Sequence, residues 1–160
     1  PSEANPDPDW TAGVLMGKRR DGRFVVADVV RARIRAAEVR KLIQNTAKLD
    51  GKRVRVVVPQ DPGQAGKDQA ENMVGQLAGQ IVSATRESGD KETRAEPFAA
   101  QWQVGNVDVV EGPWNRDYFA ELEAFPTKQA GIHDDQVDAS AGAFAELQSD
   151  KLARFMAMAQ

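Results

Sequence analysis

Hydrophobic residues occur along this chain in two repeating patterns, one typical of strands and one typical of helices. The apolar runs Trp10–Gly17 and Phe24–Arg33 are separated by the charged segment KRRDGR, and together they predict a β-hairpin. The segment before them, PSEANPDPD, contains three prolines and is predicted to be a loop.

After the hairpin, segments with helical spacing alternate with short apolar runs. The predicted helices span residues 37–49, 67–78, 96–103 and 134–147, with a further helical stripe over 114–125. The predicted strands span residues 53–60, 81–85 and 107–110. Pro97 is expected in the first turn of its helix, where proline is tolerated. The order β-β-α-β-α-β-α-β-α-α predicts an α/β fold, a mixed sheet with helices on its faces.

One of the predicted strands ends at a carboxylate. Arg53–Gln60 becomes an unbroken run of valines, as expected of a central strand buried on both faces, and Asp61 follows it. The carboxyl ends of such strands are where open α/β folds build their sites. Taken alone, Asp61 is better explained as part of an Asp-Pro-Gly turn. The residues Gly63, Gly66 and Lys67 resemble a phosphate-binding loop only weakly, because the Lys-Ser or Lys-Thr pair of a P-loop is missing.

A second acidic group opens the last predicted helix, in the segment HDDQVD at residues 133–138. Asp134 and Asp138 are four residues apart and share one helix face, whereas Asp135 points elsewhere. Capping and the helix dipole stabilise aspartates at a helix N-terminus, and taken alone this explains them equally well. A partner carboxylate at Asp61 favours function, because Mg²⁺ and Mn²⁺ are held by carboxylates from separate elements. We therefore expect Asp61, Asp134 and Asp135 to converge on one metal site.

Other candidate side chains lie near these acidic groups in the predicted fold. His133, the single histidine, is either a ligand or general base, or a residue that orients its neighbours, and the second role is favoured. Four cations lie in or beside loops expected near the site: Lys67, Arg86, Lys91 and Arg94. They are either solvated surface charges or, in a protein that cuts DNA, the contacts to phosphate.

Composition limits the classes of function. The 160 residues fit a single domain, and the net charge of −3 lacks the basic excess of typical nucleic-acid binders. The chain has no cysteine, which excludes disulfides and cysteine-based zinc sites and leaves oxygen ligands or His133 for any metal. No apolar run approaches the ~20 residues that span a bilayer, so we expect a soluble, cytoplasmic protein with no membrane partner.

The expected organisation is simple. Residues 1–9 are predicted to be an acidic, proline-rich loop, residues 10–149 one domain, and residues 150–160 a C-terminal tail. The pattern of the tail does not decide whether it extends the last helix. Since Pro1 rather than methionine opens the chain, we expect it to be a piece of a longer protein.

Five segments of the chain resemble, in their order, the C-terminal nuclease region of phage terminase large subunits. They are WTAGVLMG, PQDPGQAGK, GDKETRAEPFAAQWQVGNV, EGPWNRDYFAELEAFP and HDDQVDA, and the resemblance spans Asp7 to Leu147. It implies an RNase H-like endonuclease that cuts concatemeric viral DNA during genome packaging. It also implies two divalent ions, Mg²⁺ or Mn²⁺, held by a cluster of acidic residues.

The resemblance implies roles for individual residues. The second catalytic carboxylate of the family matches Asp61. The third matches the HDD motif, with Asp135 as the main ligand and Asp134 as its auxiliary. An acidic residue that often precedes the second strand in this family matches Asp9, or alternatively Asp7. Further auxiliary candidates are His133 and Asp138.

The resemblance also implies partners. They are double-stranded DNA, an upstream ATPase motor domain, the small terminase subunit and the portal protein. The implied location is the cytoplasm of the host cell, for a protein encoded by a phage or prophage. The first catalytic aspartate of the family sits on a strand expected upstream of Pro1. We therefore expect this fragment to bind Mg²⁺ weakly and to cleave little.

Two other interpretations stay open. Another RNase H-like nuclease, such as a Holliday-junction resolvase or a transposase core, is opposed by the GDKETRA and EGPWN segments and would be favoured by a preference for branched DNA. A catalytically silent module that grips DNA or docks on a portal or motor partner is favoured by the expected truncation.

Overall fold

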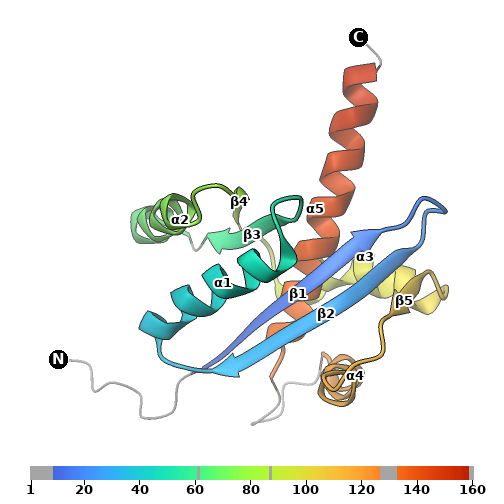
Figure 1. Ribbon diagram of the computed structural model, residues 1–160. Helices are drawn as coiled ribbons and strands as arrows, with labels where there is room; N and C mark the ends of the chain where they lie inside the picture. Colours follow the sequence, from blue (N-terminus) through green and yellow to red (C-terminus); the bar gives the residue numbers. More distant parts are fainter. Residues whose placement is uncertain (1–8, 61, 87, 127–132, 159–160) are drawn as a thin grey trace. The chain divides into compact units, whose positions relative to one another are not determined.

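The computed structural model describes residues 9–60, 62–86, 88–126 and 133–158, with side chains described up to residue 149 (Figure 1). Its elements follow the order predicted from the sequence, so the α/β class is confirmed. The strands are β1 (Trp10–Lys18), β2 (Phe24–Arg33), β3 (Arg55–Gln60), β4 (Ile81–Arg86) and β5 (Val107–Val109). The helices are α1 (Ala36–Asp50), α2 (Gln64–Gln76), α3 (Lys91–Gln103), α4 (Asn115–Ala124) and α5 (Asp135–Met158). None of the described helices is long and apolar enough to cross a membrane.

These elements form two compact units. The hairpin unit comprises Trp10–Ala32 and Gly89–Gln160, and so holds β1, β2, α3, β5, α4 and α5. The β3–β4 unit includes Arg33–Ser88, and so holds α1, β3, α2 and β4. The two acidic groups predicted from the sequence therefore belong to different units. The segment around position 61 belongs to the β3–β4 unit, and the HDD motif belongs to the hairpin unit.

The hairpin unit is built on a three-stranded sheet in the order β1-β2-β5. The arrows of β1 and β2 run in opposite directions, as in a hairpin (Figure 1), and β5 lies parallel to β2, pairing Phe24 with Val107 and Val26 with Val109. Helix α5 packs against β1 and against α3. The core between them consists of Phe24, Val26, Val29, Phe98, Tyr118 and Phe144.

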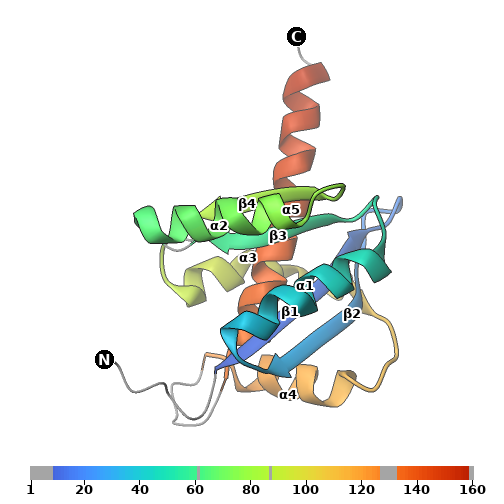
Figure 2. The ribbon, with the colours of Figure 1, turned by 60° about the vertical axis from the view of Figure 1, so that its left-hand side comes forward.

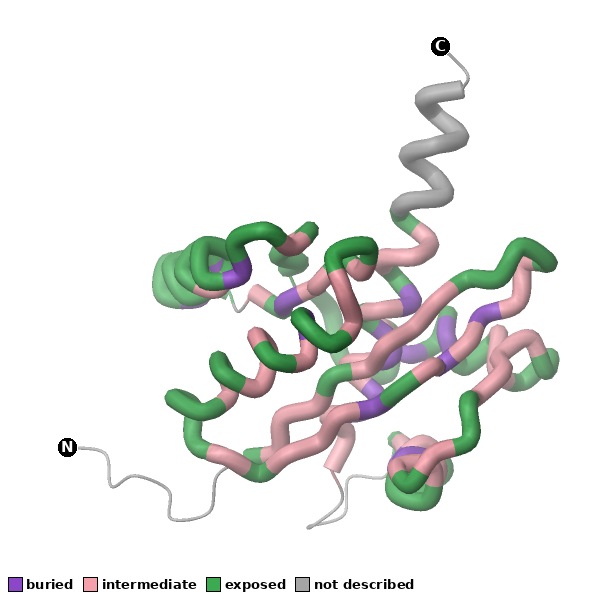
Figure 3. Tube along the Cα trace, viewed as in Figure 1, coloured by how far each residue is buried: buried purple, intermediate pink, exposed green. Residues whose placement is uncertain are grey.

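The apolar face of helix α5 packs into the core of the hairpin unit. Its apolar residues recur at helical spacing, and Val137, Ala141 and Phe144 are all buried. The ring of Phe144 lies 4.8 Å from that of Phe24 on β2, and 5.8 Å from that of Phe98 on α3. Buried positions accordingly line the part of α5 that faces the hairpin (Figure 3). The sequence left the tail undecided, and in the structure the helix continues into it as far as Met158.

The predicted start of α3 is wrong. The helix begins at Lys91 instead of residue 96, so Pro97 lies inside it and not in its first turn. The reason is Asp90, whose side chain accepts a hydrogen bond from the backbone N–H of Thr93 and caps the helix one turn earlier. The tertiary core then holds the segment beyond the proline, since Phe98 is buried.

In the β3–β4 unit the two strands run parallel, in a register that ends with Gln60 opposite Arg86. Helix α2 packs on both strands (Figure 2), and its Ala70 and Leu77 are buried as the helical stripe predicts. The central position predicted for β3 is not found in the described residues, where β4 is its one strand neighbour.

Burial in this unit also departs from the helical and strand patterns. Val58 is buried but Val56 and Val57 are only half-buried, because β3 lacks a second strand neighbour among the described residues. Leu49, on the predicted apolar stripe of α1, is 87% exposed. It lies in the last turn of its helix, where the sequence pattern alone could not show that the packed face had ended.

Candidate functional site

The acidic motif of the sequence forms a cluster at the start of α5. Asp134 precedes the helix and accepts a backbone hydrogen bond from Asp138, so the two residues are one turn apart. Lys91, the first residue of α3, bridges them: its Nζ lies 2.5 Å from Asp134 Oδ1 and 2.9 Å from Asp138 Oδ2. The predicted shared face of Asp134 and Asp138 is therefore confirmed, and it faces a lysine.

A second cation, Arg94, contacts the same face of α5. Arg94 lies one turn after Lys91 on α3, and its Nη2 is 2.9 Å from Asp138 Oδ1. Its Nη1 donates to the carbonyl oxygen of Gly89 at 3.1 Å. Because the cap at Asp90 starts α3 early, both cations fall on the helix face that meets the acidic cluster. Burial alone would lower the pKa of Lys91, but its hydrogen bonds to Asp134 and Asp138 outweigh this and raise it.

Asp135 differs from its two neighbours. Within the described part of the chain, no ion pair engages its carboxylate, which is half-buried at the first residue of α5. Burial raises the pKa of Asp135, and the negative charge of Asp134 raises it further. Its carboxylate would be stabilised by a further positive charge, which a bound cation supplies.

His133 and Asp9 occupy less specific positions. The imidazole of His133 packs edge-on against Trp10, with ring centroids 6.1 Å apart. The guanidinium of Arg31 lies over the same Trp10 ring, 4.0 Å from its centroid. Asp9 is exposed, directly before β1. These contacts make His133 a neighbour of the aromatic packing at the end of the hairpin.

Two residues in this region were missed by the sequence reasoning. Glu121 on α4 and Gln136 on α5 are both buried, and they are hydrogen-bonded to each other. A signal was present in the sequence: Glu121 comes three residues after Tyr118 and so lies on the apolar stripe of its helix. A carboxylate on such a stripe indicates a buried polar partner, but nothing in the sequence identifies that partner.

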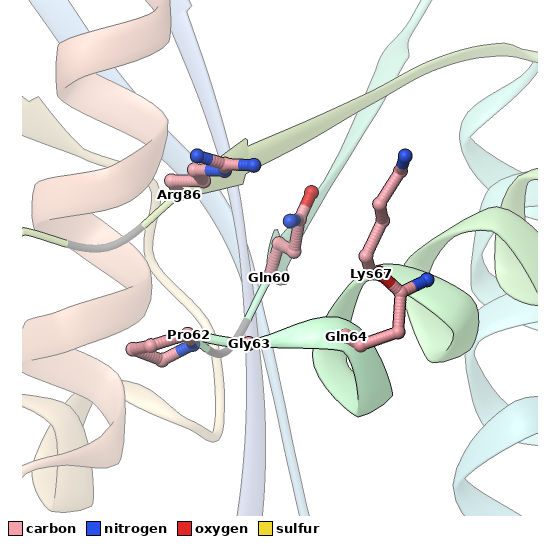
Figure 4. A pocket seen from close by; sticks show the side chains of 6 residues that line it. All are labelled: Gln60, Pro62, Gly63, Gln64, Lys67 and Arg86. Carbon is pink, nitrogen blue, oxygen red and sulfur yellow. The ribbon is translucent and has the colours of Figure 1, made fainter.

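The β3–β4 unit carries a different feature, an open pocket at the carboxyl ends of its two strands. The pocket has a volume of about 350 Å³ and is lined by Gln60, Pro62, Gly63, Gln64, Lys67 and Arg86. Figure 4 shows Gln60 between Arg86, at the end of β4, and Lys67, on the first turns of α2. Lys67 is half-exposed and lies 3.8 Å from Glu71 on its own helix. Asp61 falls between two lining residues but lies outside the described residues.

The acidic cluster fits a divalent metal only in part. Among the described residues, no three histidine, aspartate or glutamate side chains converge as a metal centre requires. In the acidic cluster, Lys91 and Arg94 already occupy the shared face of Asp134 and Asp138. Asp135 offers the hard oxygen donor that Mg²⁺ and Mn²⁺ prefer. The cluster therefore fits part of a metal site, and completing one requires ligands beyond it.

Comparison with known proteins identifies the family. No curated protein sequence matches the chain. The family described as terminase RNaseH-like domain matches residues 1–147 of the 160, a range that includes the pocket, Lys91, Arg94 and the acidic cluster. The mixed α/β architecture agrees with that fold. The chain therefore belongs to the family of terminase RNase H-like domains, which are nuclease-type domains.

Proposed function

We propose that this chain is the nuclease domain of a phage terminase large subunit, a metal-dependent endonuclease that cuts concatemeric viral DNA during genome packaging. The observation that carries the proposal is Asp135, a half-buried carboxylate without an ion pair among the described residues, in a chain that matches the terminase family over residues 1–147. A carboxylate in that environment favours a bound cation.

The proposed metal ligands are Asp61 and Asp135, with Asp134 and Asp9 as auxiliaries. Two divalent ions, Mg²⁺ or Mn²⁺, would supply an activated water and stabilise the leaving oxygen at a phosphodiester. Asp138 has a different task in this proposal: it holds Arg94 and Lys91 in place. His133 orients the start of α5 through its packing on Trp10.

The proposed DNA contacts are cations of both units. Lys67 and Arg86 line the open pocket at the strand ends, where a phosphate would meet two positive charges. Lys91 and Arg94 are ion-paired, but an ammonium has three N–H donors and a guanidinium five, so each retains donors for phosphate. Such contacts give affinity without sequence recognition.

The proposed partners follow from the family. A terminase domain works within the DNA-packaging machinery, and we propose double-stranded DNA as substrate and an ATPase motor domain, the small terminase subunit and the portal protein as partners. The host-cell cytoplasm is the proposed location. A resolvase or transposase core is disfavoured by the family match over residues 1–147.

Plasmid cleavage in Mn²⁺ by the complete gene product that contains this chain tests the proposal. Asp135→Asn keeps the volume of the side chain and removes its charge, so we expect cleavage to fall to background. Asp117→Asn is the matched control, because this aspartate is exposed in the hairpin unit with its side chain 56% accessible. Unchanged cleavage by Asp135→Asn would remove it from the site. DNA binding without cleavage by the unaltered protein would favour a silent docking module.

A further inference from the structure

The start of α5 is capped by a side chain from another helix. The first N–H groups of a helix have no partner within it and need acceptors from elsewhere. Here Glu121 Oε1 accepts from the backbone N–H of Gln136 at 2.6 Å and from that of Val137 at 3.3 Å. Its other oxygen, Oε2, accepts from Gln136 Nε2 at 2.5 Å. One carboxylate of α4 therefore accepts hydrogen bonds from two backbone N–H groups in the helix turn that carries Asp135.

Glu121 is only 6% exposed, and a buried carboxylate is costly unless it is paired and hydrogen-bonded. Its partners meet that need. Besides the donors of α5, Arg31 of β2 places its Nη2 3.5 Å from Glu121 Oε2, and Arg31 itself lies over the Trp10 ring. The positive end of the α5 dipole also favours a carboxylate at this point. Glu121 thus links α4, α5 and the hairpin.

A second hydrogen-bonded chain lies one turn further along the same two helices. Ser140 Oγ donates to the carbonyl oxygen of Gln136 at 2.7 Å. A serine has a single O–H, so the 2.8 Å hydrogen bond between Tyr118 and Ser140 is donated by the Tyr118 hydroxyl. Tyr118 and Glu121 on α4 therefore hold Ser140 and Gln136 on α5. Two ties one turn apart fix both the position and the rotation of this helix.

This rotation decides where the acidic cluster points. Asp135 is the immediate neighbour of Gln136, so any movement of the Gln136 backbone moves the Asp135 carboxylate with it. The cation pairs on α3 hold Asp134 and Asp138 from one side of α5, while Glu121 holds the first turn from α4. Asp135 has no ion pair among the described residues, and the cap on the backbone of its neighbours Gln136 and Val137 helps to hold it in place.

We propose that Glu121 is a positioning residue for the acidic site, which acts through the Gln136 and Val137 backbone to hold Asp135 in its ligand geometry. The inference rests on the proposed nuclease function. Residues that orient metal ligands affect metal affinity or activity by about 10–100-fold when they are replaced. Glu121 is expected to fall in this range, although it contacts neither metal nor DNA.

The test is Mn²⁺-dependent plasmid cleavage by the complete gene product, with the Mn²⁺ concentration at half-maximal rate measured separately from the KM for DNA. In Glu121→Ala we expect that Mn²⁺ concentration to rise, or the maximal rate to fall, about 10–100-fold with an unchanged KM for DNA. Glu121→Gln keeps an oxygen that can accept both backbone N–H groups, so it should recover much of the loss. Glu123→Ala is the matched control, because Glu123 is exposed on the same helix.

Hydrogen–deuterium exchange supplies a readout that does not depend on activity. The peptide at the start of α5 should lose protection in Glu121→Ala and regain it in Glu121→Gln, while peptides of α3 stay protected. Unchanged exchange and an unchanged Mn²⁺ requirement in Glu121→Ala would overturn the proposal. A loss of activity in proportion to unfolded protein, with no recovery in Glu121→Gln, would also overturn it.

Asp135→Asn separates this inference from the proposed function. Abolished cleavage in Asp135→Asn together with normal Mn²⁺ dependence in Glu121→Ala would leave the nuclease assignment standing and refute the positioning role. Normal cleavage in Asp135→Asn would refute the assignment of the site itself, and the positioning role with it.

Discussion

The acidic cluster of the hairpin unit and the open pocket of the β3–β4 unit hold their charges in different ways. In the cluster, Lys91 and Arg94 are ion-paired, and a buried carboxylate caps the helix beneath. In the pocket, Lys67 is half-exposed, and among the described residues it has an acidic partner in Glu71, 3.8 Å away. Several ion pairs therefore hold the cations of the cluster in place, whereas the contacts of the described residues leave the pocket cations accessible to an anion from solution.

The largest expected effect tests whether these two regions serve one reaction. Asp61→Asn, at the position between Gln60 and Pro62 in the sequence, should lower Mn²⁺-dependent plasmid cleavage by at least ~100-fold, as Asp135→Asn in the cluster should. A metal-stabilised charge is worth several kcal/mol, and each ~1.4 kcal/mol is a tenfold change in rate. A strong loss from Asp135→Asn with normal cleavage by Asp61→Asn would confine the chemistry to the cluster.

The second prediction concerns the difference in packing between the units. Phe144→Ala should lower the free energy of unfolding by about 3–5 kcal/mol, because the ring is 3% exposed and packs on Phe24 and Phe98. Leu49→Ala in the β3–β4 unit should change it by no more than about 0.5 kcal/mol, since Leu49 is 87% exposed. Urea unfolding measures both free energies. Equal losses of stability in the two variants would show that Leu49 is buried in solution.

The third prediction compares paired and open cations in DNA binding. Lys67→Ala and Arg86→Ala should each reduce the slope of log affinity against log salt by about 0.9, as expected when one phosphate contact is lost. Lys91→Ala should reduce it less, because two aspartates already neutralise this ammonium. Lys52→Ala, at an exposed turn, is the control. A larger change for Lys91 than for Lys67 would reverse the proposed division of roles.

The smallest expected effect is an acid-dependent one. Hydrogen bonds from Arg23 and Arg19 outweigh the effect of burial and lower the pKa of Asp108 to about 2. Because the folded-state pKa is depressed, the stabilisation is fully present above the unfolded value near 3.8 and is lost as the pH falls through about 2.

Asp108→Asn should therefore flatten the dependence of stability on pH between about 4 and 2. Asp68→Asn, an exposed position in the other unit, serves as the control. Acid titrations of unfolding free energy measure the difference. An unchanged slope in Asp108→Asn would show that the arginine pairs do not persist in solution.

The sequence by itself determined the order of the elements and the residues of the acidic motif. Period-2 and helical patterns are local, so β2 was predicted at its observed bounds and the buried face of α5 follows from its spacing. The same local reasoning placed the start of α3 too late, because Pro97 suggested a first turn while Asp90 supplied the cap. It also placed Asp134 and Asp138 on one face, because four residues make about one helical turn.

Only the tertiary structure decided what meets the acidic motif. Lys91 is 43 residues from Asp134, Arg94 is 44 residues from Asp138, and Glu121 is 15 residues from Gln136. No periodicity connects positions so far apart, because their contact depends on how α3 and α4 pack against α5. The sequence could present an aspartate-rich helix start. The packing of three helices decided that Asp134 and Asp138 are ion-paired with Lys91 and Arg94, and that Asp135 forms no ion pair among the described residues.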